Sequence, residues 1–443
     1  MGSIGNGTQT LEALNGKMGE KWLPYDRTVL DEWLLSMVTY AAESPQNQPL
    51  SSVVLEFRDL IESDTEIFMH ATSMFDQIPN EAPYNQDSLG RTQIRDYRHM
   101  LHLMDAVLTS APKWDDFVAT IGWVGFPLNV LLNWPMSTPS GKAFFLNRKV
   151  NAVLGKILNA WGDYLSSEAS ANVLTTEKGG WLSGSAVEAV NKVANAGKTE
   201  LSFKELFVCD QSLPHWGYKS WDHFFTRQLQ PGVRPVEAPE DNSIIISACE
   251  SKPYRLSKDV ARRDTFWVKG QPYSLVDMLD HDPLAENFIG GTVYQAFLSG
   301  LSYHRWHSPI SGTIIKCHKT AGTYYSKALS QDFGSNRTSL SPSQGYLAEV
   351  ATRAFVYIQA DNPAIGLMCV IPIGMAEVST CDITVEVGQH VNKGEELGMF
   401  HYGGSTYCLV FRPETVLEWT PEASGTVALT GNIPLNSQIA RVL

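Results

Sequence analysis

A short stretch near residue 400 holds the residue types with which a chain can cut itself: Phe400-His401-Tyr402-Gly403-Gly404-Ser405-Thr406. The carbonyl of Gly404 has no side chain to obstruct attack, and both glycines can adopt backbone angles that other residues avoid. The Ser405 hydroxyl can attack that carbonyl and convert the peptide bond to an ester. β-Elimination of the ester leaves dehydroalanine at position 405, which hydrolyses to a pyruvoyl group. A pyruvoyl carbonyl condenses with amines and accepts electrons. Gly-Gly-Ser is also common in ordinary hairpin turns, so this chemistry requires a base in the right place.

Two histidines upstream are the candidates for that base. His304 and His307 lie three residues apart in Tyr303-His304-Arg305-Trp306-His307-Ser308-Pro309. Histidine is the side chain best suited to move protons at neutral pH. A pair of half-buried structural histidines is the plain alternative. A metal site is not expected, because neither a His-Glu-x-x-His helix nor a Cys-x-x-Cys pair accompanies the two histidines.

Together these motifs resemble the phosphatidylserine decarboxylase family. The resemblance covers roughly residues 200–443 and follows the family's order along the chain. It rests on the Tyr-His-Arg-x-His and Gly-Ser-Thr motifs and on three further segments, which are Tyr218–Arg227 with Val233-Arg234-Pro235, Lys269-Gly270 with Tyr273-Ser274-Leu275, and Gly394–Phe400.

The chain departs from the family pattern at two places. An extra glycine, Gly403, precedes the usual Gly-Ser-Thr, and Cys249-Glu250-Ser251 stands where the family carries an Asp-Gly pair. Both departures resemble a soluble branch of the family, the fungal L-tryptophan decarboxylases, which also carry an N-terminal extension. Glu250 is the carboxylate that could replace the missing aspartate.

The resemblance implies a maturation step and roles for the residues around it. It implies self-cleavage between Gly404 and Ser405, with separate chains on either side and a pyruvoyl group as the cofactor. His307 would remove the Ser405 proton, and Glu250 would orient His307. Gly403 and Thr406 would lie around the new group, with Thr406 either contacting the nascent oxygen or serving as a plain strand residue.

The resemblance also implies the later reaction, which is loss of CO₂ from a small amino acid. His304 would supply the proton that replaces the carboxyl group. The branch implies a free L-aromatic amino acid as substrate, with L-tryptophan as the leading case. Phosphatidylserine remains an alternative substrate. A non-catalytic binding module is a third reading, which the intact Ser405, His304 and His307 disfavour.

Composition restricts the class of protein and its partners. The chain has 443 residues, with 34 Lys and Arg against 47 Asp and Glu, for a net charge of −13. This acidic balance argues against nucleic acid and, mildly, against anionic lipid surfaces. The six cysteines are widely spaced and no leader or membrane span is evident, so a cytoplasmic protein with reduced thiols and no stable membrane insertion is expected. The oligomeric state stays open, and a homo-oligomer is one option.

The pattern of helices and strands that must position these residues indicates an α+β protein. We expect a disordered N-terminus over 1–25, a helical module over 26–168, a mixed linker over 169–200 and a mostly β catalytic domain over 201–443. The clearest helix has an apolar stripe at Leu146, Val150, Val153, Leu154, Ile157, Leu158 and Trp161. Strands are predicted at Ile244–Ser247, Thr292–Leu298, Thr313–Lys316, Phe355–Gln359, Leu367–Ile373 and Glu386–Val387.

Three turn segments with similar sequences suggest a swollen-hairpin barrel core, the architecture of biotinyl and lipoyl carriers. These segments are Ser308–Ile314, Val387–Gly394 and Thr420–Val427. A carrier function would require a lysine at a hairpin tip in a Met-Lys-Met or Asp-Lys-Ala context. The sequence contains neither, so we expect only the shared architecture.

Overall fold

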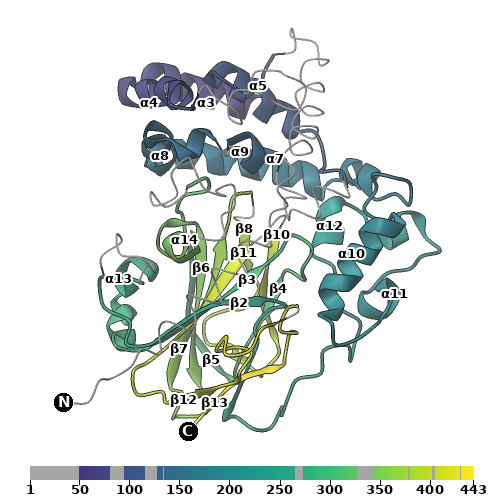
Figure 1. Ribbon diagram of the computed structural model, residues 1–443, viewed down its shortest axis with the longest axis vertical. Helices are drawn as coiled ribbons and strands as arrows, with labels where there is room; N and C mark the ends of the chain where they lie inside the picture. The colour runs from purple at the N-terminus through teal and green to yellow at the C-terminus, as the bar shows by residue number, and fades with distance from the viewer. Residues whose placement is uncertain are drawn as a thin grey trace.

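A computed structural model describes the fold of nine stretches of the chain (Figure 1). The predicted disorder over 1–25 lies outside these stretches. The described residues are 49–79, 94–114, 127–132, 134–264, 273–326, 344–377, 380–401, 405–429 and 431–443.

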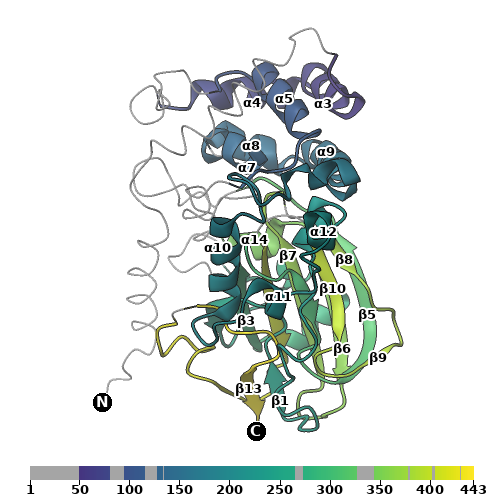
Figure 2. The ribbon, with the colours of Figure 1, turned by 90° about the vertical axis from the view of Figure 1, so that its right-hand side faces the viewer.

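The N-terminal half of the described chain is helical, as the sequence predicts. Its helices form two layers above one end of the strands, with α3, α4 and α5 outside and α7, α8 and α9 nearer the strands (Figures 1 and 2). The bounds are α3 Ser52–Ser63, α4 Thr65–Asp76, α5 Tyr97–Val107, α7 Pro127–Leu132, α8 Pro139–Leu146 and α9 Arg148–Ser166.

Helix α9 shows why this part of the sequence is helical. The Asn147 side chain caps it by accepting the backbone N–H groups of Lys149 and Val150. Its apolar stripe is buried as predicted, from Val150 to Trp161. Leu146 is the exception, because α8 ends at that residue and leaves its side chain 37% exposed.

Short helices connect this module to the strands. They are α10 Gly184–Asn195, α11 Phe203–Leu206 and α12 Trp221–Phe225. Helix α10 lies within the segment for which the sequence predicts a mixture of linker and helix. Helix α12 begins after Ser220, whose hydroxyl accepts the backbone N–H of His223.

The strands form three antiparallel sheets within the described residues. The largest has the order β2-β3-β11-β7-β6-β5-β9, and the smaller two have the orders β4-β10-β8 and β1-β13-β12. The bounds are β1 Ile244–Ile246, β2 Lys252–Ser257, β3 Thr292–Leu298, β4 Arg305–His307, β5 Gly312–Thr320, β6 Arg353–Ala360, β7 Leu367–Gly374, β8 Thr380–Ile383, β9 His390–Val391, β10 Glu396–His401, β11 Ser405–Phe411, β12 Leu417–Trp419 and β13 Gln438–Val442.

Five of the six predicted strands are present, and one is wrong. Glu386–Val387 lies in a turn, where the N–H of Gln389 donates to the carbonyl of Glu386 at 3.1 Å. Gly388 takes a φ of +89° there, a conformation that favours glycine. A local turn with this glycine outweighs the strand preference of one valine.

The α+β class is confirmed. None of the three sheets closes into a barrel within the described stretches, so the swollen-hairpin core stays a prediction.

The seven-stranded sheet is buried on both faces. Side chains on one face of β11, such as Tyr407 and Leu409, share a core with Trp306 and Phe400 of the β4-β10-β8 sheet. Cys408 and Val410 on the other face pack with residues of α13 (Leu275–Met278) and α14 (Gln344–Val350). Period-two alternation along β11 therefore sends successive side chains into two different cores.

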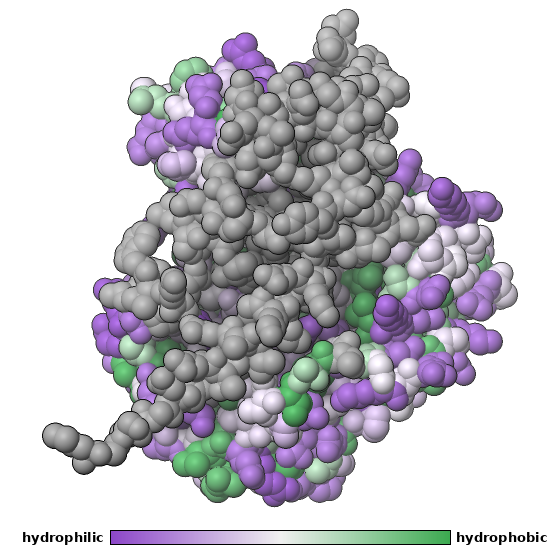
Figure 3. All heavy atoms as spheres, in the orientation of Figure 1, coloured by the Kyte–Doolittle hydropathy of each residue, from purple (hydrophilic) through white to green (hydrophobic). Residues whose placement is uncertain are grey.

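Apolar side chains on the described surface are scattered. Figure 3 shows small groups of hydrophobic residues separated by hydrophilic ones on the described part of this face. The most exposed large apolar residues include Met69, Val387 and Val416, which belong to separate parts of the fold. Singly exposed residues of this kind need no partner to explain them.

Candidate active site

Ser405 begins β11, a central strand of the largest sheet. It pairs with Leu298 of β3 on one side and with Gly374 of β7 on the other. The residue is fully buried, and its Oγ has no hydrogen-bond partner among the described residues. The hydroxyl that the sequence predicts as the nucleophile is therefore held in place by its strand while its oxygen stays uncommitted. Gly403 and Gly404 lie outside the described residues.

Thr406 faces the other side of the sheet, into a polar network. Its Oγ1 donates to the carbonyl of Ala296 at 2.9 Å and lies 3.2 Å from the Gln344 Oε1. It accepts a bond of 3.1 Å from the Gln295 Nε2. Because successive residues of a strand point to opposite faces, these bonds hold the strand from the side opposite to Ser405.

His304 lies beside the end of β10, the strand that precedes the Gly-Gly-Ser motif. Its backbone carbonyl accepts the N–H of Phe400 at 2.9 Å. Its ring is fully buried and stacks on Phe225 of α12, with 4.1 Å between ring centroids. The fold therefore places one predicted histidine beside the strand that precedes the predicted cleavage site.

His307 is held at both ring nitrogens. Its Nδ1 lies 2.8 Å from the carbonyl oxygen of Gly394, and its Nε2 lies 3.0 Å from the Tyr303 hydroxyl. A carbonyl oxygen can only accept, so Nδ1 carries the hydrogen and Nε2 accepts the Tyr303 hydroxyl proton. Burial lowers the pKa of His307 and outweighs the Gly394 carbonyl and the Glu396 charge, which raise it. The ring is thus neutral at neutral pH, the form that a base requires.

The segment 247–251 connects His307 to the strand of Ser405. The N–H of His307 donates to the Ala248 carbonyl at 2.9 Å. The hydroxyls of Ser247 and Ser251 lie 3.3 and 3.4 Å from the Tyr407 hydroxyl. Tyr407 is two residues from Ser405 and shares its face of β11, so His307 lies on the same side of the sheet as Ser405.

Glu250 is buried in this neighbourhood, and its partners are Arg234 and Leu435. Its Oε1 accepts Arg234 Nε at 2.5 Å and the backbone N–H of Leu435 at 3.1 Å. The described hydrogen bonds of the His307 ring go to Tyr303 and Gly394, and the Glu250 carboxylate bonds to neither ring nitrogen. Burial raises the pKa of the Tyr303 hydroxyl, Arg305 lowers it, and the charges of Glu396 and Glu250 raise it further. The orienting role of Glu250 stays a prediction.

The sequence reasoning missed a histidine–carboxylate pair near this site, His401 with Asp222. The Nδ1 of His401 lies 3.0 Å from each carboxylate oxygen of Asp222, and its Nε2 lies 3.9 Å from Asp382. Burial lowers the pKa of His401, but the bond to Asp222 and the charges of Asp222 and Asp382 raise it above its usual value. Asp222 and Phe225 lie one helical turn apart, so α12 contacts both His401 and His304. The available signal was that Asp222 belongs to a segment that carries the resemblance and that His401 directly follows another.

Metal-binding and reactive cysteine sites were also considered. No group of three His, Cys, Asp or Glu side chains in the described part of the chain is placed to hold a metal ion. Burial raises the pKa of the Cys249 and Cys408 thiols well above the usual value. Both thiols are therefore protonated at neutral pH.

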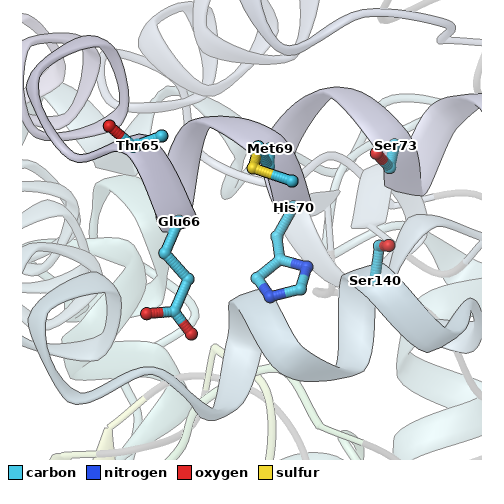
Figure 4. Close-up of a pocket in the computed structure, with 6 residues that line it drawn as sticks. All are labelled: Thr65, Glu66, Met69, His70, Ser73 and Ser140. Carbon is cyan, nitrogen blue, oxygen red and sulfur yellow. The ribbon is translucent and has the colours of Figure 1, made fainter.

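A surface pocket of about 380 Å³ lies in the helical layers, between α4 and α8. Figure 4 shows Glu66 and His70 pointing from α4 toward the helix that carries Ser140. None of the predicted site residues lines this pocket, whose lining consists of Thr65, Glu66, Met69, His70, Ser73 and Ser140.

The sequence matches the models of one known protein family. The family model for phosphatidylserine decarboxylase matches residues 221–430, and a second model of that description matches residues 51–190. A fungal relative, decarboxylase iboD of Amanita muscaria, is 45% identical over 72% of this chain and 91% of its own length. The chain belongs to the phosphatidylserine decarboxylase family.

Other relatives place it in a fungal branch of that family. The L-tryptophan decarboxylase of Psilocybe cubensis is 34% identical over 89% of this chain and 88% of its own length. Phosphatidylserine decarboxylase proenzyme 3 of Schizosaccharomyces pombe is 29% identical over 49% of this chain and 21% of its own length. Because the family and these relatives are decarboxylases, the chain is a lyase.

One structural feature bears on membrane association. None of the helices in the described stretches is both long enough and apolar enough to span a bilayer.

Proposed function

We propose that this decarboxylase cuts itself between Gly404 and Ser405 and then converts a free L-aromatic amino acid to its amine and CO₂. L-tryptophan is the leading candidate for that substrate. The observation that carries the proposal is the buried, uncommitted Oγ of Ser405 at the first residue of a central strand. The relatives named L-tryptophan decarboxylase support the substrate class, and the proenzymes in the family support the cleavage. The acidic net charge of −13 supports a free amino acid over an anionic lipid.

Ser405 is the residue from which a pyruvoyl group would form, and its surroundings fit that group. The side chain is excluded from water, and its neighbour Gly374 carries no side chain that would crowd the position. When present, a pyruvoyl group supplies a carbonyl that condenses with the substrate amine and accepts the electron pair left by CO₂. Gly403 and Gly404 would provide the backbone freedom for cleavage, and Thr406 would hold the strand in place.

His307 is the proposed base for cleavage. The Nε2 of His307 would first release its hydrogen bond from the Tyr303 hydroxyl. Its lone pair would then take the Ser405 proton. Arg234 fixes Glu250, and Glu250 would act on the histidine indirectly, through the Tyr303 hydroxyl that bonds to its ring. Glu250 is therefore a positioning residue in this scheme.

His304 is the proposed proton donor in turnover. Stacking on Phe225 and the bond from Phe400 fix its position beside the strand that leads to the cleavage motif. From there it would supply the proton that replaces the lost carboxyl group of the substrate. Replacement of His304 by alanine would leave cleavage intact and slow product formation.

Intact-mass spectrometry tests the cleavage and the cofactor together. We expect two fragments that meet at Gly404 and Ser405, the smaller starting as pyruvoyl, and a tryptophan adduct on that fragment after borohydride reduction. The Ser405→Ala variant should remain one chain of 49.1 kDa. An uncut wild-type chain would overturn the proposal and favour the binding-module alternative.

Substrate choice needs a separate assay. Mature enzyme would be given free tryptophan, tyrosine or phenylalanine, and in parallel liposomes that contain phosphatidylserine. Release of CO₂ from the liposomes alone would replace the proposal with phosphatidylserine decarboxylation. A cytoplasmic location accompanies the amino-acid proposal, and fractionation of expressing cells tests it.

A further inference from the structure

Three buried rings of α12 and the Tyr-His-Arg-x-His motif form a stack that ends at His304. The Phe225 ring lies 4.1 Å from the His304 ring, with 19° between the two planes. Phe225 also stacks with Trp221, at 5.2 Å between ring centroids and 21° between planes. Trp221 and Phe225 lie four residues apart on α12, so the helix itself sets their spacing. The stack therefore ties the plane of the His304 ring to α12.

The residues at the end of α12 also hold the backbone on both sides of His304. The carbonyl of Thr226 accepts the Nε–H of Arg305 at 2.8 Å, one residue after the histidine. The Nη2 of Arg227, which is buried, donates to the carbonyl of Leu301 at 2.8 Å, three residues before it. A shift of His304 would therefore break contacts with α12 or with the two residues that follow this helix.

The helical module holds α12 from the other side. Figure 2 shows α12 between α9 and the strands β8 and β10. The backbone N–H of Trp221, the first residue of α12, donates to the Oγ of Ser170 at 2.9 Å. An N–H at this position has no acceptor within its own helix. Ser170 is fully buried, and its hydroxyl donates to the carbonyl of Leu165 in α9 at 2.7 Å. Ser170 therefore joins the end of α9 to the start of α12.

Trp181 makes a second contact between the helical module and α12. Its ring is buried and meets the Trp221 ring edge to face, at 5.7 Å between centroids and 73° between planes. Its Nε1 donates to the carbonyl of Pro112, in the segment after α5, at 2.7 Å. The backbone and the ring of Trp221 are thus both held by residues N-terminal to α12.

We propose that Phe225 positions the His304 ring for proton transfer and that Ser170 connects this positioning to the helical module. This inference rests on the proposed function and deepens it. A proton donor must point a ring nitrogen at the carbon that loses the carboxyl group, and a misplacement of about 1 Å can cost about a hundredfold in rate. Stacking fixes the plane of the ring and therefore the directions in which its nitrogens point. The helical module would then take part in turnover as well as in packing.

The first test follows the His304 ring without requiring turnover. Uncleaved Ser405→Ala protein is labelled with ¹³C-histidine, and the His304 signal is assigned by its loss in His304→Gln. A ring stacked on Phe225 carries an upfield ring-current shift in its NMR spectrum. We expect Phe225→Leu to remove that shift and Ser170→Ala to change it. A His304 signal that does not move in Ser170→Ala would overturn the inference.

Ser167→Ala and Phe203→Leu are the matched controls. The hydroxyl of Ser167 bonds to the carbonyl of Tyr164 in α9, and its bonds in the described structure do not reach α12. Phe203 is a buried ring of α11 that stacks on Phe224. Both variants should leave the His304 signal in place even where they lower Tm. An equal movement of this signal in the controls would show general loosening of the core and contradict the inference.

Turnover provides the second test. Phe225→Leu should cleave itself and keep its KM for tryptophan, but lose about tenfold or more in kcat, and Ser170→Ala should lose less. In D₂O the deuteron that replaces the carboxyl group should enter the wild-type product on one face. In Phe225→Leu it should enter on both faces, because solvent can then deliver it. NMR of the amine coupled to a chiral acid measures the two configurations.

The outcomes separate this inference from the proposed function. If folded and cleaved Phe225→Leu keeps its kcat and a single product configuration while wild type decarboxylates tryptophan, the inference is overturned and the proposed function stands. If Phe225→Leu does not fold, Ser170→Ala decides both tests. A mature wild type that acts on none of the free aromatic amino acids overturns the proposed function, and the inference falls with it.

Discussion

The backbone N–H of Phe400 donates a hydrogen bond of 2.9 Å to the carbonyl oxygen of His304. This bond joins the strand that precedes the Gly-Gly-Ser motif to the Tyr-His-Arg-x-His motif. In the same strand pair, His307 lies opposite Glu396, at the far end of β10. Because a one-residue slip would turn every side chain to the other face, this register fixes which histidine lies beside the C-terminal end of β10. The two histidines are three residues apart in sequence and have different surroundings.

His307 should set the acid limit of self-cleavage. Its pKa is lowered in the fold, so the ring is neutral at pH 6.5 and gains a proton only as the pH falls through the lowered value. Cleavage should therefore proceed at a constant rate around neutrality and slow only below pH 6.5. The appearance of the two fragments after cell-free synthesis at a series of pH values measures this. Efficient cleavage in His307→Ala would remove His307 from the scheme.

Tyr303→Phe should move that acid limit to higher pH. The Tyr303 hydroxyl bonds to the neutral ring at Nε2, and loss of a bond to the neutral form raises the pKa of the ring. The same cleavage time courses, recorded for Tyr303→Phe, report the shift. Tyr218→Phe is a suitable control, because its hydroxyl bonds to the Val208 carbonyl and touches neither histidine. An acid limit that does not move in Tyr303→Phe would contradict the assigned tautomer.

The main effect of Glu250→Gln should be a lower free energy of unfolding. The change leaves Arg234 buried without its counter-charge, which costs about 3–5 kcal/mol of unfolding free energy. Denaturant unfolding of the uncleaved Ser405→Ala background measures this cost. Adding Arg234→Gln should restore part of it, because no unpaired charge remains. Normal stability combined with lost cleavage would instead support direct orientation of His307 by Glu250.

Asp222→Asn should destabilise the protein mainly at low pH. The folded-state pKa of His401 is raised, so its pairing with Asp222 stabilises the fold fully below pH 6.5 and loses effect as the pH rises through the raised value. The loss below pH 6.5 should be about 1.5–3 kcal/mol. Unfolding of both proteins across this pH range checks the sign. Asp382→Asn should have a smaller effect, because the Asp382 carboxylate lies 3.9 Å from the His401 Nε2 and its side chain is 49% exposed. An equal loss at all pH values would argue against a charged pair.

Thr406→Val should lower stability while cleavage continues. The change keeps the branched shape but removes the bonds from Thr406 to Ala296 and Gln344 and leaves the Gln295 amide without an acceptor. We expect the free energy of unfolding to fall by about 1–3 kcal/mol. Thermal unfolding measures the loss, and intact mass reports cleavage. Thr406→Ser, which retains the hydroxyl, is the control. Blocked cleavage in a folded Thr406→Val would show that this hydroxyl acts on the Ser405 side.

Residue type and spacing were enough to propose Ser405 as the nucleophile and His304 and His307 as proton-transfer groups, and these roles stay predictions. Gly-Gly-Ser and Tyr-His-Arg-x-His are local patterns whose chemistry depends on a few adjacent side chains. The stripe on α9 was equally predictable, because helical periodicity is a local property. Asp222 was missed as the partner of His401, since no local pattern shows that α12 packs against the end of β10.

The sequence by itself determined the α+β class, the family resemblance and the residues able to do chemistry. Tertiary structure alone decided which of those residues meet, and it paired Glu250 with Arg234, His307 with Tyr303, and Asn129 with Glu377. Asn129 and Glu377 lie 248 residues apart in the chain, whereas Arg234 and Glu250 lie 16 apart and Tyr303 and His307 only 4 apart. Strand register and the burial of polar groups select the partners, and both depend on how the whole chain packs.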